Sequence, residues 1–251
     1  MNLQELLHRI RRKWMKIRLQ PIRVFVFHHV SKERNPLICM QEDWTQLDQF
    51  KRNIENQQRQ YTFISLETAC DKLQHDLFRM RKYAVITTDD GFASVLSVMP
   101  WLEEKHIPLT LFVNTRYMDG DKLKPVHEKW LRELAPNVDS KTIAKQMYLS
   151  REQIWSLTSP LIEIGLHGHE HLNAKQTSES QFEADIDTCI AKLQEHPRFI
   201  RAFAYPWGDA TKESLIYLKK QDIIPIVVRG GRNYIWEGSV DRECIDNTDL
   251  K

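Results

Sequence analysis

Short apolar runs alternate with longer amphipathic segments along most of this 251-residue chain, and this alternation constrains its fold more than any other feature. Runs of β-branched and aromatic residues are typical of buried strands, and apolar residues three and four apart are typical of helices. Strands are predicted at 22–27, 83–87, 109–113, 161–166, 199–205 and 223–228, and helices at 43–58, 65–75, 91–104, 150–157, 178–196 and 211–220. Such alternation predicts an α/β domain with a mainly parallel sheet, either closed into a barrel or open.

The composition favours one globular domain. Hydrophobic residues make up 41% of the chain and aromatic residues 10%, which is enough to form a core. We place this domain at 21–251. Residues 115–149 are polar and cannot be assigned clearly to helices or strands, so we interpret them as an insertion. The four cysteines form no Cys-x-x-Cys pair and are interpreted as free thiols in a reducing compartment: Cys39, Cys70, Cys189 and Cys244. The net charge of +2 gives no support for a nucleic-acid partner.

Residues 1–20 form a basic amphipathic segment. Six Lys and Arg side chains fill the gaps between apolar residues at helical spacing, and Glu5 is the only acid. The segment either packs on the domain with a solvated basic face or lies on an anionic membrane surface. Since the chain shows no spanning run and no signal-peptide core, we expect a cytoplasmic protein, with peripheral contact to the inner membrane face as the alternative.

Polar clusters follow four of the predicted strands. They are His28-His29, Asp89-Asp90, the histidine cluster His167-Gly-His-Glu-His171, and Tyr205-Pro-Trp-Gly208. In parallel α/β folds the carboxyl ends of the strands meet on one rim, and chemistry gathers there. The sequence therefore predicts an active site on this rim.

Two of these clusters together suit a divalent metal ion. His167 and His171 stand four residues apart, so both imidazoles can reach one ion, and zinc accepts histidine nitrogen together with carboxylate oxygen. Because Asp89 and Asp90 are adjacent, one can bind the ion while the other faces the attacking water. The competing interpretation is that the histidines lie on a surface loop and that Asp-Asp-Gly is only a turn.

Three segments resemble the motifs of the polysaccharide deacetylases, the NodB-like carbohydrate esterase family 4. Thr88–Gly91 resembles their Thr-Phe-Asp-Asp-Gly, His167–His171 resembles His-Ser/Thr-x-x-His, and Ala204–Gly208 is similar to Arg-Pro-Pro-Tyr-Gly. Phe27–Val30 and Tyr61–Ser65 look like the subgroup that includes biofilm poly-N-acetylglucosamine deacetylases. The resemblance spans about residues 22 to 229.

The resemblance implies a deformed (β/α) barrel that hydrolyses N-acetyl or O-acetyl groups on a sugar or polysaccharide intermediate. It assigns Asp90, His167 and His171 to a divalent metal, zinc first, with cobalt or nickel as alternatives. Asp89 would be the general base for the attacking water. The backbone N–H of Trp207 would stabilise the oxyanion together with the metal.

The chain also departs from the family pattern. Gly168 replaces the Ser or Thr after the first histidine, Thr88 stands where Phe is usual, and Ala204 replaces the arginine that orients the base. Arg201 lies three residues before Ala204, but on a strand it would point to the opposite face. No Leu-x-His motif follows His196, so the general acid is His28, His29 or His169, or it is absent.

Two other functions remain open on the sequence. If the acid is absent, the chain is a carbohydrate-binding protein without catalysis, although binding alone does not require Asp89. The same site would also serve a metal-dependent amidohydrolase acting on a small non-sugar amide. Four aromatic residues either stack on a sugar ring or belong to the core: Tyr205, Trp207, Tyr234 and Trp236.

Overall fold

The structure is a computed structural model. It describes residues 19–34, 44–76, 78–120, 129, 133, 137, 139–246, 248 and 250. Nearly all of the basic segment 1–20 lies outside the described residues, so its helical form and its membrane contact stay predictions. No helix within the described ranges has the length and apolar character needed to cross a bilayer.

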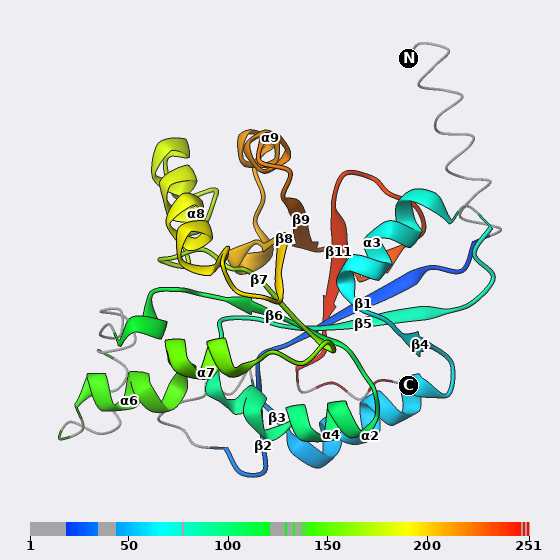
Figure 1. The fold of residues 1–251 in the computed structure, drawn as a ribbon, viewed down its shortest axis with the longest axis horizontal. Helices are drawn as coiled ribbons and strands as arrows, with labels where there is room; N and C mark the ends of the chain where they lie inside the picture. The colour runs from blue at the N-terminus through cyan, green and yellow to red at the C-terminus, as the bar shows by residue number, and fades with distance from the viewer. Residues whose placement is uncertain are drawn as a thin grey trace.

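A closed parallel barrel forms the centre of the molecule (Figure 1). Within the described residues its seven strands are β1 (Ile22–Phe27), β5 (Tyr83–Thr88), β6 (Leu109–Val113), β7 (Ile162–Leu166), β8 (Phe199–Ala204), β9 (Ile224–Val228) and β11 (Val240–Cys244). Neighbouring strands follow the order β1-β11-β9-β8-β7-β6-β5, and β5 pairs again with β1 to close the ring. The predicted deformed (β/α) barrel is therefore confirmed.

Among the described residues, four short strands lie outside this ring. β4 (Thr62–Phe63) extends the sheet beside β5, and β10 (Arg232–Asn233) pairs antiparallel with β1. β2 (His29–Ser31) and β3 (Trp44–Gln46) form a separate two-stranded sheet. The start of the helix predicted at 43–58 is therefore strand β3, and the helix α2 begins at Leu47.

Helices cover the outside of the barrel. They are α2 (Leu47–Gln58), α3 (Leu66–His75), α4 (Met99–Glu104), α6 (Ser140–Met147), α7 (Arg151–Ser156), α8 (Glu179–Leu193) and α9 (Lys212–Lys220), with short 3-10 turns η1 (Ala93–Ser97), η2 (Tyr117–Asp119) and η3 (Pro206–Gly208). Ser65 and Ser150 cap α3 and α7, as their positions before apolar periodic segments suggest. The single helix predicted at 91–104 is divided into η1 and α4, with a proline in the first turn of α4.

Alternation along the strands separates two apolar layers. Side chains that face the barrel interior, such as Val24, Val85 and Ile226, pack with α3 at the amino-terminal end of the strands. The intervening residues pack outward against the other helices. The buried Glu163 on β7 accepts hydrogen bonds from the first amides of α3, Leu66 N at 2.9 Å among them. This leaves the carboxyl ends of the strands free to carry polar side chains.

Candidate active site

Asp90, His167 and His171 converge at the carboxyl rim of the barrel. Asp90 follows β5, and both histidines follow β7. Asp90 Oδ1 lies 3.2 Å from His171 Nε2 and 3.4 Å from His167 Nε2. One ligand atom from each residue lies within 4.8 Å of the other two. The structure thus brings together the three residues that the sequence analysis assigned to a metal.

The donor set fits a divalent ion of the zinc type. Bonds of about 2.0–2.2 Å to nitrogen and oxygen place neighbouring ligand atoms roughly 3.0–3.5 Å apart, and the distances from Asp90 Oδ1 to the two histidine nitrogens lie in this range. His167 Nδ1 donates to the Ala204 carbonyl at 2.8 Å. Its Nε2, on the side of Asp90, is therefore the ring nitrogen that can bind an ion. Three protein ligands leave coordination positions for water and substrate.

Electrostatics at this point favour a positive charge. Burial alone would raise the pKa of Asp90, but the effects of His171 and His167 are larger and the net pKa is lowered. The carboxylate is therefore held in its ionised form. Burial alone would lower the pKa of His167, but Asp89 and Asp90 outweigh this and raise it. A bound cation would supply the charge that the protons supply in its absence.

The backbone is strained around this cluster. Asp90, His171 and Trp207 have φ values of 67°, 53° and 64°. They are three of five non-glycine residues with positive φ in the described part of the chain. Each such conformation costs on the order of 1–3 kcal/mol, and it persists only where the surroundings enforce it. Gly91, at φ 73°, completes the turn that directs Asp90 inward.

Asp89 forms a buried ion pair with Arg242 of β11. Arg242 Nη1 and Nη2 donate to the two Asp89 oxygens at 2.6 and 2.7 Å, and Nη1 also donates to Thr87 Oγ1 at 3.1 Å. Burial alone would raise the pKa of Asp89, but Arg242 and then His167 lower it more strongly. The carboxylate is therefore held ionised and in one orientation, as a base must be.

His28 lies beside these acids because β1 pairs with β5. Phe27 is in register with Thr88, so the residues that follow, His28 and Asp89, are neighbours on the rim. Asp246 accepts from His28 Nδ1 at 2.6 Å and from the His28 backbone N–H at 3.1 Å. Burial alone would lower the pKa of His28, but the hydrogen bond with Asp246 leads the effects that raise it well above its usual value. Asp246 thus favours the protonated form of His28.

The other two acid candidates are directed elsewhere. His29 is buried, its ring centroid lies 3.7 Å from that of Phe92, and burial lowers its pKa to about 3. The stacking on Phe92 favours a packing role for His29, and its assignment as the acid stays a prediction. His169 Nδ1 contacts Thr115 Oγ1 at 3.0 Å, and its Nε2 lies 3.6 Å from a Glu170 oxygen. It does not join the ligand cluster.

Comparison with known proteins identifies the family. A polysaccharide deacetylase model matches residues 79–225, more than half of the chain. The chain belongs to the polysaccharide deacetylase family. It is accordingly a hydrolase that acts on the carbon–nitrogen bonds of acetyl groups. No curated protein matches the chain.

Solved structures share the fold of this polysaccharide deacetylase. IcaB from Ammonifex degensii is 22% identical with a TM-score of 0.69, over 91% of this chain and 94% of that one. Deacetylase PplD from Streptococcus pyogenes is 16% identical with a TM-score of 0.68, over 90% and 92%. The BpsB deacetylase domain from Bordetella bronchiseptica is 18% identical with a TM-score of 0.64, over 90% and 96%.

In this deacetylase an arginine reaches Asp89 from another strand. Ala204 and Arg242 both belong to inward-facing positions of the barrel, so the guanidinium of Arg242 on β11 can contact Asp89 although residue 204 is alanine. Arg201, the candidate considered in the sequence, is exposed and donates to the Gln221 carbonyl on the outside. Sequence reasoning missed Arg242 because 240–244 carries too many charges to be recognised as a strand.

The missing hydroxyl after the first histidine is also compensated. Gly168 has φ 78°, and a Cβ there would lie 2.5 Å from Asp185 Oδ2. Asp185, on α8, accepts from the His169 and Glu170 backbone N–H groups at 2.9 and 2.6 Å. A carboxylate from α8 therefore holds the histidine loop in the space that a larger residue 168 would need.

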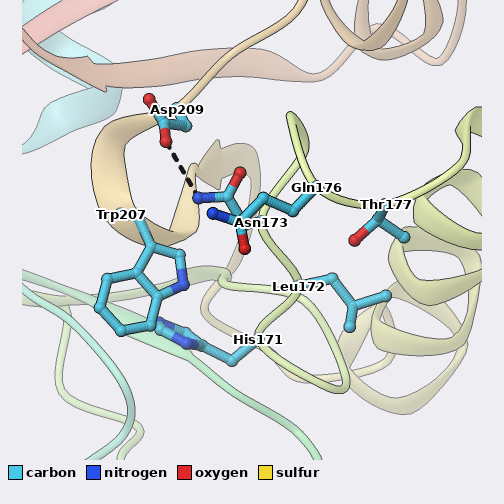
Figure 2. Close-up of a pocket in the computed structure, with 7 residues that line it drawn as sticks. All are labelled: His171, Leu172, Asn173, Gln176, Thr177, Trp207 and Asp209. Carbon is cyan, nitrogen blue, oxygen red and sulfur yellow. Dashed lines mark hydrogen bonds between the residues drawn. The ribbon is translucent and has the colours of Figure 1, made fainter.

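A pocket of about 590 Å³ opens beside the ligand cluster (Figure 2). Its lining residues are His171, Leu172, Asn173, Gln176, Thr177, Trp207 and Asp209. The Trp207 side chain is 74% exposed, and its ring centroid lies 5.4 Å from that of His171. Asp209 is held by Asn173 at 2.9 Å and by Lys175. An exposed indole beside polar side chains is suited to stacking on a sugar ring.

The other aromatic candidates do not line this pocket. Tyr205 is buried and donates its hydroxyl to Ser214 at 2.9 Å, so it belongs to the core. Trp236 packs against the interior cluster, and its backbone N–H donates to Leu73 at 2.9 Å. The Tyr234 carbonyl accepts from Arg79, near the amino-terminal end of the strands. Of the four aromatic residues, only Trp207 stands at the rim.

Proposed function

We propose that this protein is a metal-dependent deacetylase that hydrolyses N-acetyl groups on a saccharide, with poly-N-acetylglucosamine-type chains as the substrate class. One observation supports this above all others: the Asp89 carboxylate, paired with Arg242, and the His28 imidazole, paired with Asp246, flank the cluster of Asp90, His167 and His171. Amide hydrolysis requires a proton acceptor for water and a proton donor for the leaving nitrogen.

Asp90, His167 and His171 would hold the ion, with zinc as the first choice and cobalt or nickel as alternatives. When bound, the ion would supply Lewis acidity, which lowers the pKa of water and polarises the acetyl carbonyl. Asp89 takes the proton of the attacking water as the new C–O bond forms. Arg242 keeps Asp89 ionised for this step. The Trp207 backbone N–H, on the turn that adjoins His171, faces the oxyanion in this proposal.

His28 completes the reaction by donating its proton to the amide nitrogen as the C–N bond breaks. The products are acetate and a free amine on the sugar. An amine is a poor leaving group until it is protonated, so a charged His28 favours an N-acetyl substrate over an O-acetyl one. In this proposal His28 takes the role of the general acid that a Leu-x-His motif would otherwise supply. The argument for a carbohydrate-binding protein without catalysis, which depended on the missing acid, is then weaker.

The pocket beside Trp207 supports a saccharide rather than a small amide, because its volume exceeds that of an acetamido group and its lining combines an exposed indole with polar side chains. The PplD structure is a complex with acetate, the product expected here. Peripheral membrane contact through residues 1–20 stays part of the proposal and rests on the charge of that segment, and the cytoplasmic location stays a prediction.

Acetate release tests this function. Protein loaded with zinc, cobalt or nickel is expected to release acetate from N-acetylated oligosaccharides faster than from O-acetylated sugars or simple acetamides. His171→Ala should lose both the bound ion, measured by elemental analysis, and the release of acetate. Metal-loaded protein that acts only on simple acetamides would establish the small-amide alternative. If the loaded protein releases no acetate from any substrate in the panel, the proposal is wrong.

The pH profile tests the acid. Because His28 donates only while it is protonated, kcat/KM should fall as pH rises through its pKa, which lies above the ordinary histidine value of about 6.5. Asp246→Asn removes the carboxylate partner, so this alkaline limb should move to lower pH by roughly one unit or more. Glu243→Gln, on the strand β11 that precedes Asp246 but paired with Arg23, serves as the matched control. An unmoved limb in Asp246→Asn would rule out the pair as the source of the proton.

A further inference from the structure

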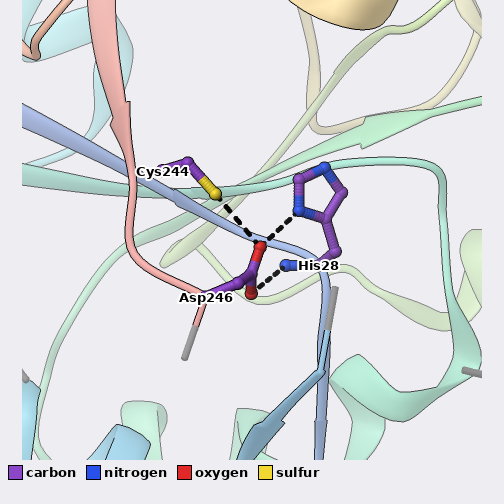
Figure 3. Close-up of side chains that lie close together, drawn as sticks. All are labelled: His28, Cys244 and Asp246. Atoms are coloured by element: carbon purple, nitrogen blue, oxygen red, sulfur yellow. Dashed lines mark hydrogen bonds and ion pairs between the residues drawn. The ribbon is translucent and has the colours of Figure 1, made fainter. Parts of the chain in front are cut away.

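A second group of metal-ligand side chains lies where β1 and β11 end. His28 Nδ1 is 2.6 Å from Asp246 Oδ2, and Cys244 Sγ is 3.3 Å from the same oxygen. One ligand atom from each residue lies within 4.8 Å of the other two. Figure 3 shows the imidazole and the thiol on either side of this carboxylate oxygen. None of the three belongs to the cluster of Asp90, His167 and His171.

The barrel register brings these residues together. Val26 is paired with Cys244 in the parallel β1–β11 ladder, and Ile245 N donates to the Val26 carbonyl at 2.9 Å. The segments that follow the two strands then leave the ladder side by side, with His28 on the segment after β1 and Asp246 on the segment after β11. Asp246 is buried, whereas Cys244 is exposed, so the group has a fixed base and an open side that solvent ions can reach.

The thiol distinguishes this group from the catalytic cluster. Imidazole, thiolate and carboxylate in one place form a ligand set typical of zinc and cobalt, and magnesium and calcium do not favour sulfur. Cys70 and Cys189 are buried, and burial raises the pKa of each thiol to about 12. Among the cysteines of the described residues, Cys244 is therefore the one suited to bind an ion from solution.

We propose that His28 Nδ1, Cys244 Sγ and an Asp246 oxygen form a second site for a thiophilic divalent cation such as zinc, and that occupation of this site inhibits the enzyme. Binding releases the thiol proton and the Nδ1 proton to solvent. A metal–sulfur bond and a metal–nitrogen bond replace the two bonds to hydrogen, and the Asp246 oxygen is the third ligand. The imidazole then keeps only its Nε2 proton and is no longer the imidazolium that protonates the leaving nitrogen. The inhibition rests on the proposed role of His28, whereas the binding does not.

Cobalt titration tests the binding. Purified metal-free protein is expected to take up two equivalents of Co²⁺, and only the weaker should produce an intense near-ultraviolet thiolate-to-cobalt charge-transfer band. Cys244→Ser should keep the stronger equivalent, which also shows that it is folded, and lose the band. Cys39→Ser, which changes a cysteine outside the described residues, should keep the band. Absence of the band in the parent protein, or its persistence in Cys244→Ser, would overturn the site.

Acetate release in the presence of zinc tests the inhibition. Each protein is compared with its own rate at one equivalent of zinc. Further zinc should lower the rate of the parent protein at least tenfold and should leave the rate of Cys244→Ser unchanged. Binding without inhibition would uphold the site and contradict the role of His28. If the protein releases no acetate under any condition, the proposed function fails, and the cobalt titration still decides whether the site exists.

Discussion

Asp89→Asn is expected to lower the rate of acetate release by about a hundredfold to ten-thousandfold while the protein keeps its metal ion. Asparagine has nearly the same shape and can still accept one hydrogen bond from Arg242, but it cannot take a proton from water. The ligand atoms of Asp90, His167 and His171 are unchanged. The measurements are initial rates of acetate release and the metal content of the purified variant.

Asp90→Asn is the matched control for this prediction. It alters the adjacent carboxylate, whose Oδ1 faces both histidines, so it should lose bound metal as well as activity. The two variants therefore separate the base from the ligand. If Asp89→Asn retained the parent rate, or if it lost the ion as readily as Asp90→Asn, the division of labour between the two acids would be incorrect.

Arg242→Met is expected to destabilise the folded protein by about 3–5 kcal/mol at neutral pH, because it leaves Asp89 as a buried charge without its partner. The folded-state pKa of Asp89 is lower than the unfolded value of about 3.9. The pair therefore stabilises the protein above that pH, and the contribution is lost as pH falls through the folded pKa. Urea denaturation at neutral and acidic pH should show a smaller loss in acid.

A double variant separates stability from catalysis. Asp89→Asn combined with Arg242→Met removes both charges, so it should recover much of the stability that Arg242→Met alone loses and remain without turnover. Arg201→Met, an exposed arginine of β8, should change neither the free energy of unfolding nor the rate. A double variant as unstable as Arg242→Met would show that the guanidinium stabilises the barrel through Thr87 and Phe112 rather than through Asp89.

The fold was predictable where strand sequences are mainly apolar. β6 is buried at every position, and the only charged residues of β1 and β8 are Arg23 and Arg201, so each strand appears as a short apolar run with clear limits. β11 could not be recognised in this way, because three of its five residues are charged: Asp241, Arg242 and Glu243. An arginine inside a barrel is stable only beside a buried acid, and that partner lies 153 positions away in the sequence.

The site divides along the same line. Asp90, His167 and His171 were predictable because motif spacing and strand ends point to them directly. Asp185, Arg242 and Asp246 were not, because each acts on a residue that is distant in sequence and has no periodic pattern of its own. Polar support of this kind depends on the three-dimensional register of neighbouring strands and helices, which local sequence does not encode.

The pairing of β1 with β11 joins the two ends of the domain. Two contacts at the rim, His28 with Asp246 and Arg242 with Asp89, depend on this pairing. His28 meets Asp246 across 218 positions, and Arg242 enters the barrel from the same last strand. Contacts so far apart in the chain are slow to form during folding. A nascent chain released from the ribosome before β11 docks would carry all three metal ligands yet lack the oriented base and the charged donor. With the roles proposed for Asp89 and His28, hydrolysis would begin only once the barrel has closed.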